Sequence, residues 1–469
     1  MNALGLELGL GGLIVVVFFV GLFGPGGDRR RVGVVAAIGL VVLFGLALRA
    51  EPGGILLGGA FVQDELALFA KRLFLLATIL AILGSLALRQ PTFARRGTEY
   101  YLAILASLLG MLVLASAREL ILLFVAFELM SIPLYILSGF QKREPEAVEA
   151  ALKFFLVGTV SSAVIAYGFS FIYGIARTTD LAGLAGALEE GHPVLLLGMM
   201  LTLAGLGFKI AAVPFHMWVP DTYEAASTPY VAWLSVAPKA AGFVVIFRLY
   251  LEGLGDRVLL WVPLTAGLAA ITIVAGNLMA IPQQNIKRML AYSGVAHIGY
   301  MLVGFAAVSA SGAAMMLFYL VAYLFGNMGA FLVVEAVAQS EGSEHMTAYK
   351  GLAQRSPVLA LAMLLFLLSL GGIPFVAGFW AKVYVFWAAA EQGLYWLVLV
   401  GAVLTVVALF YYLLVAKRMY IDAPERVGPV AVSPLLGLSI FICAAGVVVM
   451  GVYPKPFVMA ALRVASTLF

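Results

Sequence analysis

Long apolar runs dominate this chain of 469 residues. About fourteen of them are long enough to cross the hydrocarbon core of a bilayer, which takes roughly 20 apolar residues per helix. Backbone groups inside lipid must be hydrogen-bonded within their own segment, so runs of this kind form helices. The strict apolar–polar alternation of an outer-membrane barrel is absent from the sequence. We therefore predict an all-α, polytopic membrane protein with about 14 transmembrane helices.

The composition supports the same class. Hydrophobic residues make up 64% of the chain and charged residues 11%, whereas a typical soluble domain has about 25% charged residues. A soluble protein of this size would need far more polar surface to remain dispersed. These values argue against a cytosolic globular fold, a disordered chain and a nucleic-acid-binding protein.

Motifs for binding redox cofactors or nucleotides are missing from the sequence. The single cysteine, Cys443, cannot hold an iron–sulfur cluster or build a zinc site. No G-x-G-x-x-G follows a strand-like run, and no phosphate-binding loop motif is present. We therefore expect no cofactor and no metal on this chain, and any coupled redox chemistry would take place on another subunit.

The positions of lysine and arginine predict an orientation. If the N-terminus lies outside, most loop lysines and arginines fall on the inner side, as the positive-inside rule requires. Lys287 and Arg288 belong to this inner group, while Lys71, Arg118 and Arg248 are assigned to the outer side. We therefore predict both termini on the non-cytoplasmic face of the membrane.

Five ionisable residues lie inside apolar runs. They are one acid and four lysines: Glu128, Lys153, Lys209, Lys239 and Lys382. Each costs at least a few kcal/mol in a bilayer and is a functional candidate by default. The alternative for a lysine near a helix end is that its ammonium reaches the interface, and Lys153, with Glu149 four residues before it, fits that alternative best.

Proline and glycine interrupt the runs next to three of these lysines. Pro214 follows Lys209, Pro238 precedes Lys239, and Gly371-Gly-Ile-Pro374 precedes Lys382. Broken membrane helices are tolerated where they face protein or water. Paired interruptions in two halves of a chain indicate repeats with an ion path at their interface.

A histidine and the Glu–Lys combination suggest proton chemistry. His297 lies about two turns inside its run, and its alternative role is a hydrogen-bonded core residue. A buried lysine between a carboxylate and a second ammonium could switch between holding and releasing a proton. We therefore consider these groups as members of one proton path.

Four stretches resemble a known family. They are Glu128–Tyr135, Phe208–Tyr223, Gln284–Ser293 and Gly372–Lys382. These stretches are similar to motifs in the antiporter-like membrane subunits of respiratory complex I, the proton-pumping NADH:quinone oxidoreductase, with subunit N the most similar. The resemblance runs from about residue 100 to residue 420. Phe375 departs from it, because the family often has a second proline there.

The resemblance implies roles for the buried groups. Glu128 and Lys209 would be the paired acid and base of the first half, Lys239 and His297 would lie on a central hydrophilic axis, and Lys382 would lead to the exit. Lys153 matches a lysine of subunit N-like chains.

The resemblance also implies a domain organisation. Two inverted five-helix repeats containing broken helices would occupy 99–251 (helices 4–8) and 258–416 (helices 9–13). Three helices would precede them in 1–98, and helix 14 with a tail would follow in 417–469.

The function that the resemblance implies is proton translocation in a bacterial cell (inner) membrane, coupled to electron transfer from NADH to quinone. NAD, FMN, iron–sulfur clusters and quinone would then be bound by partner subunits. The expected partners are the antiporter-like subunit M, the small membrane subunits and the lipid bilayer. Two alternatives stay open: a subunit of a multi-subunit sodium/proton antiporter, and a membrane scaffold whose buried charges only fix helix packing.

Overall fold

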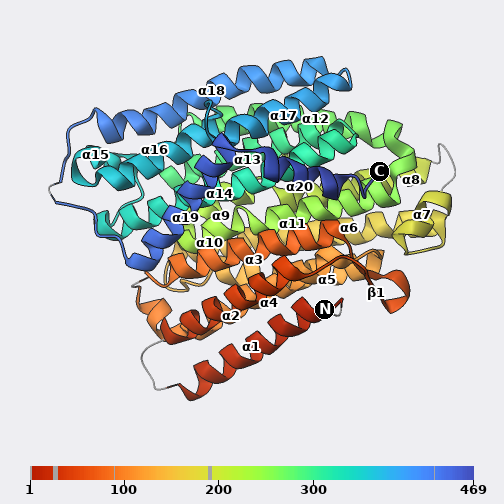
Figure 1. Ribbon diagram of the computed structural model, residues 1–469, viewed down its shortest axis with the longest axis horizontal. Helices are drawn as coiled ribbons and strands as arrows, with labels where there is room; N and C mark the ends of the chain where they lie inside the picture. The colour runs from red at the N-terminus through yellow and green to blue at the C-terminus, as the bar shows by residue number, and fades with distance from the viewer. Residues whose placement is uncertain (1–2, 25–29, 89, 188–192, 427) are drawn as a thin grey trace. The chain divides into compact units, whose positions relative to one another are not determined.

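The computed structural model describes residues 3–24, 30–88, 90–187, 193–426 and 428–469 (Figure 1). Arg29, Arg89 and His192 lie outside the described residues. Within the described part, thirteen helices are long and apolar enough to cross a membrane, and a shorter apolar helix accompanies them. The predicted all-α polytopic class is confirmed, while the inverted relation between the repeats stays a prediction.

The chain forms two compact units, which are described separately. The first unit comprises the residues up to 210, residues 237–261 and the last four residues, and the second comprises 211–236 and 262–465. The elements of the first unit are α1 (Gly5–Phe23), α2 (Arg30–Arg49), β1 (Gly54–Leu56), β2 (Phe61–Gln63), α3 (Glu65–Ser85), α4 (Pro91–Ser116), α5 (Leu120–Ser138), α6 (Pro145–Ala176), α7 (Leu181–Ala187), α8 (Pro193–Ile210), α11 (Ala237–Ile246) and the π-helix η2 (Phe247–Gly253).

Helices α1 to α4 pack against one another in the first unit, as the red and orange ribbons of Figure 1 show. A short antiparallel hairpin, β1 with β2, joins α2 to α3. Asp64 then caps α3, because its carboxylate accepts a hydrogen bond from the Ala67 amide at 2.9 Å. Glu119 caps α5 in the same way through the Leu122 amide at 2.8 Å. These caps fix where the helices begin.

Helix α5 presents an apolar stripe to the outside of its unit. Ile121, Val125, Ile132 and Ile136 are each more than half exposed. Such a stripe would be unfavourable in water and is the expected surface of a helix in contact with lipid or with another membrane subunit.

The second unit is built around α14 (Ala310–Glu341), which is buried along nearly its whole length. The other elements of this unit are α9 (Trp218–Ala225), α10 (Thr228–Leu234), most of α12 (Val258–Ala280), α13 (Ile286–Ala306), α15 (Leu352–Arg355), α16 (Pro357–Gly371), α17 (Ala377–Glu391), α18 (Tyr395–Tyr420), α19 (Pro434–Val452) and α20 (Lys455–Ala465). Helices α10, α13, α16, α17, α19 and α20 all pack on α14.

One apolar run that the sequence predicts as a single span is two helices. The run at 357–386 forms α16 and α17, which are separated by a short non-helical stretch. Gly372 has φ 82° and Phe375 has φ 74°, both in the left-handed region. This region is ordinary for glycine but costly for phenylalanine. The predicted interruption before Lys382 is therefore present, and Phe375 occupies a strained position within it.

Candidate functional site

Helix α8 ends beside its lysine. Lys209 is the second-last residue of α8, and the next residue after the helix, Ala211, has φ 68°. An alanine in the left-handed region is uncommon and stops the helical hydrogen-bond pattern at this point. The Lys209 side chain is 5% exposed. The break that the sequence predicts thus lies directly next to a buried ammonium.

Helix α5 supplies the partners of Lys209. The Lys209 Nζ donates to Ser131 Oγ at 2.8 Å and to Tyr135 Oη at 3.1 Å. It lies 3.8 Å from Glu128 Oε1 and 5.0 Å from the centre of the Phe127 ring. Glu128, Ser131 and Tyr135 are spaced i, i+3, i+7, which puts them on one face of α5. The structure therefore brings Glu128 and Lys209 together, and their roles as acid and base stay a prediction.

Glu128 and Lys209 differ in their access to the surroundings. The Glu128 side chain is 27% exposed, against 5% for Lys209. Glu128 also accepts a hydrogen bond from Ser162 Oγ on α6. A hydroxyl can both donate and accept a hydrogen bond, so each member of the pair has its own hydroxyl partners: Ser162 for Glu128, and Ser131 and Tyr135 for Lys209.

Lys239 lies on α11, which packs against α8 in the same unit. Its side chain is buried, at 1% exposure. A Cβ on Gly242, one turn further along α11, would come within 2.7 Å of the Ile210 side chain. This close approach places the helix turn that follows Lys239 next to the end of α8, which carries Lys209. Lys239 is therefore buried in the same unit as the Glu128–Lys209 pair.

Lys153 is placed differently from the other lysines. Its Nζ pairs with Glu149 Oε1 at 2.7 Å on the same helix, and the two side chains are 48% and 65% exposed. Exposed i, i+4 pairs contribute only about 0.3–0.5 kcal/mol. A role for Lys153 stays a prediction.

His297 is the centre of a hydroxyl cluster in the second unit. Its Nδ1 lies 2.7 Å from Tyr319 Oη and its Nε2 lies 3.3 Å from Tyr412 Oη. The Tyr412 hydroxyl in turn contacts Ser293 Oγ. An imidazole hydrogen-bonded at both nitrogens can accept a proton on one side and release one on the other.

Lys382 lies at the break between α16 and α17. Its Nζ donates to the Gly371 carbonyl oxygen at 3.2 Å and lies 4.7 Å from the centre of the Tyr300 ring. The Gly371 carbonyl belongs to the last turn of α16, where carbonyls have no partner within the helix. The Tyr300 hydroxyl accepts from Asn277 Nδ2 at 3.2 Å, and Asn277 Oδ1 accepts from Tyr411 Oη at 3.1 Å. A polar chain thus begins at the Tyr300 hydroxyl, whose ring lies beside Lys382.

Lys287 is a buried lysine that the sequence assigns to an inner loop. It is 2% exposed, and its Nζ donates to the carbonyl oxygens of Glu224 and Ala226 and to Glu344 Oε1, at 2.7–2.8 Å. The neighbouring Arg288 binds Asp221 and Glu224 at 2.8 Å each. These contacts tie the start of α13 to the chain around α9. Asn285, which caps α13, is the sequence signal that could have placed Lys287 inside the helix.

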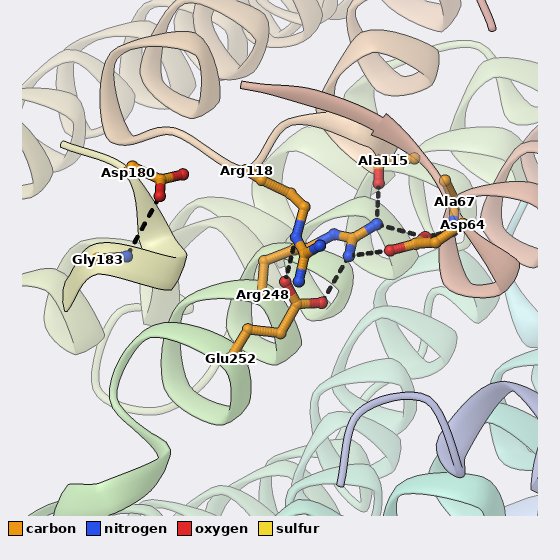
Figure 2. A network of polar contacts seen from close by, with 8 residues as sticks. All are labelled: Asp64, Ala67, Ala115, Arg118, Asp180, Gly183, Arg248 and Glu252. Atoms are coloured by element: carbon orange, nitrogen blue, oxygen red, sulfur yellow. Dashed lines mark hydrogen bonds and ion pairs between the residues drawn. The ribbon is translucent and has the colours of Figure 1, made fainter. Parts of the chain in front are cut away.

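A second cluster missed by the sequence reasoning surrounds Arg248 in η2 (Figure 2). The Arg248 guanidinium is fully buried and binds Asp64 through both terminal nitrogens, Glu252 through one and the Ala115 carbonyl through the other. Arg118 binds the other Glu252 oxygen at 2.9 Å. Burial alone would raise the pKa of Asp64, but the adjacent Arg248 holds the pKa of that carboxyl below its ordinary value.

Within the described residues, no group of three or more His, Cys, Asp or Glu side chains is arranged to hold a metal ion. The ionisable groups of each unit are instead arranged as pairs and hydrogen-bonded chains.

Helix breaks beside buried lysines in a polytopic helical chain are typical of ion-translocating membrane proteins, and this chain has both features. The transmembrane family model described as "NADH:quinone oxidoreductase/Mrp antiporter" matches residues 117–408. NADH-quinone oxidoreductase subunit N of Moorella thermoacetica is 42% identical over 98% of this chain and 96% of its own length. Its counterpart in Desulforamulus reducens is 39% identical over 98% and 97%. The chain therefore belongs to the subunit N family of NADH-quinone oxidoreductase.

Solved structures show the same fold. A chain of respiratory complex I from Thermus thermophilus superposes with a TM-score of 0.83 at 31% identity, covering 97% of this chain and 98% of that one. A chain of the Mrp complex from Dietzia sp. superposes with a TM-score of 0.88 at 20% identity, covering 99% and 97%. The likeness to the Mrp chain shows the fold alone.

Proposed function

We propose that this chain is the proton-translocating membrane subunit N of NADH:quinone oxidoreductase. The observation that carries this proposal is the Glu128–Lys209 pair at the end of α8, in which two further hydroxyls, of Ser131 and Tyr135, accept hydrogen bonds from the lysine. Ionisable groups in this arrangement are costly in a membrane and have a direct use in moving a proton.

Each unit contributes its own protonatable groups. In the first unit, Glu128 accepts a proton from the surroundings, Lys209, 3.8 Å away, takes it up, and Lys239 continues the path. In the second unit, His297 continues the path within its tyrosine cluster, and Lys382, beside the Tyr300 ring, leads to the exit. Lys153, at the surface of α6, would supply a positive charge beside this path.

The driving force would come from partner subunits. We propose that these carry NAD, FMN, the iron–sulfur clusters and quinone, and that subunit M and the small membrane subunits contact this chain. The exposed apolar face of α5, with Glu128 at 27% exposure, offers such a contact surface. We further propose that both termini lie on the non-cytoplasmic side.

A sodium/proton antiporter subunit is the competing function, and the relatives do not favour it. The experiment that separates the two uses inverted membrane vesicles in sodium-free potassium buffer. NADH oxidation should acidify the vesicle interior at the same rate with or without added sodium. Acidification that requires sodium, or that is released by a sodium gradient without NADH, would contradict the proposed function.

A further inference from the structure

An open groove on the first unit has no place in the proton route described above. It lies between α5 and α6 and has a volume of about 690 Å³. Along most of its length it is lined by apolar side chains, which include Leu120, Ile121 and Phe124 of α5 and Ala166 and Phe169 of α6. Sites for small organic ligands have volumes of about 300–1,000 Å³, so the groove has room for a ligand of that size.

One face of α6 forms the second wall of the groove. Ala166, Ser170, Tyr173 and Arg177 are spaced i, i+4, i+7, i+11 and therefore lie on the same side of the helix axis. Ala166 and Ser170 are small and leave space beside α5. The Ser170 hydroxyl donates to the Tyr167 carbonyl oxygen at 2.7 Å, so it is satisfied within its own helix. The wall thus changes from apolar at Ala166 to positively charged at Arg177.

Arg177 gives the groove a cationic end. It directly follows α6 and has φ 57°, in the left-handed region that glycine usually fills at a helix end. The residue is exposed. Arg118, the neighbouring arginine, is paired with Glu252, whereas Arg177 has no ion-pair partner among the residues that the structure describes. An arginine in a backbone conformation that favours glycine, with its charge uncompensated, indicates a use for its guanidinium.

The chain at this end of the groove is held in place by its backbone. The Leu120 amide donates to the Thr179 carbonyl oxygen at 2.9 Å, and the Leu181 amide donates to the Arg118 carbonyl oxygen at 3.0 Å. These two hydrogen bonds tie the segment after α6 to the start of α5. Arg177 is therefore presented from a fixed segment and not from a free loop.

The two carboxylates next in sequence to this end are occupied elsewhere. Figure 2 shows the Asp180 carboxylate turned toward the Gly183 amide, from which it accepts a hydrogen bond at 3.2 Å. The Glu119 carboxylate accepts from the Leu122 amide at 2.8 Å. Neither acid lines the groove. The electrostatic character of this end is therefore set by Arg177, and it favours an anion.

The other end of the groove lies inside the apolar part of the two helices. Phe124 is one turn before Glu128 on α5, and Ala166 is one turn after Ser162 on α6. Ser162 donates to Glu128, which links the two helices just beyond the groove. The groove thus runs from the ends of the helices, where α5 begins and α6 ends, toward the middle of the first unit.

We propose that this groove binds one anionic phospholipid. Arg177 binds the phosphate, Thr178 and Thr179, which line the same end, offer hydroxyl donors, and an acyl chain lies between α5 and α6. A cationic end at the helix termini and an apolar remainder match the two parts of a lipid in order and in depth. A headgroup with a net negative charge is preferred over a zwitterionic one, because its charge compensates that of Arg177.

The lipid leaves room for the contacts proposed above. The groove ends before Ile132 and Ile136, so the later turns of α5 stay available to a partner subunit. With the orientation proposed above, the lipid belongs to the non-cytoplasmic leaflet. The site does not depend on proton translocation, and its test does not measure pumping.

The experiment uses the complex purified with its partner subunits and reconstituted into phosphatidylcholine vesicles. Two probes are added in separate samples, phosphatidylglycerol and phosphatidylcholine, each with the same diazirine in an acyl chain. After irradiation, mass spectrometry of peptides gives the yield of each lipid adduct on α5 and α6. The ratio of the two yields in the groove measures the preference for an anionic headgroup.

Two variants test the two parts of the site. Arg177→Gln removes the cation, and its matched control is Arg49→Gln, since Arg49 is an exposed arginine at the end of α2. Ser170→Trp fills the groove, and its matched control is Leu156→Trp, because Leu156 is 53% exposed on α6 and lies outside the groove. All four substitutions are at exposed positions, where the fold tolerates a change.

We expect phosphatidylglycerol to be favoured about fivefold in the groove, the effect of one basic side chain on an anionic lipid. Arg177→Gln should abolish this preference and Arg49→Gln should leave it unchanged. Ser170→Trp should reduce the adducts of both lipids, and Leu156→Trp should not. An equal preference in wild type and Arg177→Gln would mean that Arg177 serves only the end of α6, and the proposal would be wrong. It would also be wrong if neither lipid labels the groove, because another subunit then covers it.

Discussion

The Lys209 ammonium lies 3.8 Å from the Glu128 carboxylate, but it donates its hydrogen bonds to Ser131 and Tyr135 on the same face of α5. The charged pair is therefore close enough for strong attraction but is not closed by a direct hydrogen bond. A direct, fully satisfied pair would hold its proton tightly, whereas this arrangement leaves room for the proton to move.

The charge of Glu128 should matter more than its shape. Glu128→Gln keeps the hydrogen-bonding outline but removes the carboxylate that stabilises the protonated Lys209, while Glu128→Asp keeps the charge on a shorter side chain. We expect Glu128→Gln to lower NADH-driven proton uptake by about tenfold, which corresponds to about 1.4 kcal/mol, and Glu128→Asp to be clearly milder. Equal activity of the two variants would show that only the shape of this side chain matters.

The Tyr135 hydroxyl should contribute to proton pumping independently of the aromatic ring that carries it. Tyr135→Phe keeps the aromatic ring beside Lys209 and removes one of the two oxygen atoms to which Lys209 donates. A hydrogen bond to a charged group contributes about 1.5–3 kcal/mol, so the pumping rate should fall several-fold while the amount of assembled complex stays the same. Tyr167→Phe, an exposed tyrosine on α6, is the control. A Tyr135→Phe variant that pumps like the control would remove this hydroxyl from the path.

Proton pumping should be impaired both when Lys382 loses its charge and when that charge is made permanent. Lys382→Met keeps similar bulk but cannot bind a proton, and Lys382→Arg holds its proton at any working pH because its guanidinium is almost never deprotonated. Both variants should impair proton uptake by vesicles, normalised to assembled complex. Full pumping by Lys382→Arg would show that a fixed charge at the α16–α17 break is sufficient.

Asp64 should stabilise the first unit in a pH-dependent manner. Its pKa is held below the ordinary value by Arg248, so its contribution is fully present above the unfolded pKa of about 3.9 and is lost as the pH falls through the folded pKa. Asp64→Asn leaves Arg248 buried with one carboxylate fewer. This change should lower the free energy of unfolding by on the order of 3 kcal/mol at neutral pH.

Thermal unfolding of the purified complex tests this expectation for Asp64. The gap in unfolding temperature between wild type and Asp64→Asn should be largest at neutral pH and should narrow below about pH 4. A gap that does not change with pH would mean that the cost comes from packing and not from the charge.

Much of the site is predictable because helix breaks leave local signals. Glycine and proline next to Lys209 and Lys382 predict the ends of α8 and α16, and both lysines are buried where the sequence places them. The hydroxyl partners of Lys209 were not predictable, because they come from α5, more than seventy residues earlier in the chain.

Lys71 and Arg248 were assigned to loops from the edges of the apolar runs, but both side chains are buried. Lys71 stands at the edge of its apolar run, but the Asp64 cap starts α3 at Glu65 and so draws Lys71 into the membrane domain. Arg248 lies near the end of its run and is fully buried, because Asp64 and Glu252 neutralise it. A charged residue near the end of an apolar run indicates a helix end only when the fold brings no oppositely charged residue next to it. Whether such a partner is present depends on tertiary packing, which the sequence pattern does not show.

The central claim is that Lys209 carries protons through this subunit, and the most direct measurement is on Lys209→Ala in membrane vesicles. Proton uptake and quinone-linked NADH oxidation are recorded on the same preparation, and the amount of assembled complex is determined by gel electrophoresis of the native membranes. We predict that proton uptake and NADH oxidation fall together, by tenfold or more, in fully assembled complex. Normal oxidation with normal proton uptake in assembled complex would contradict this account of the protein.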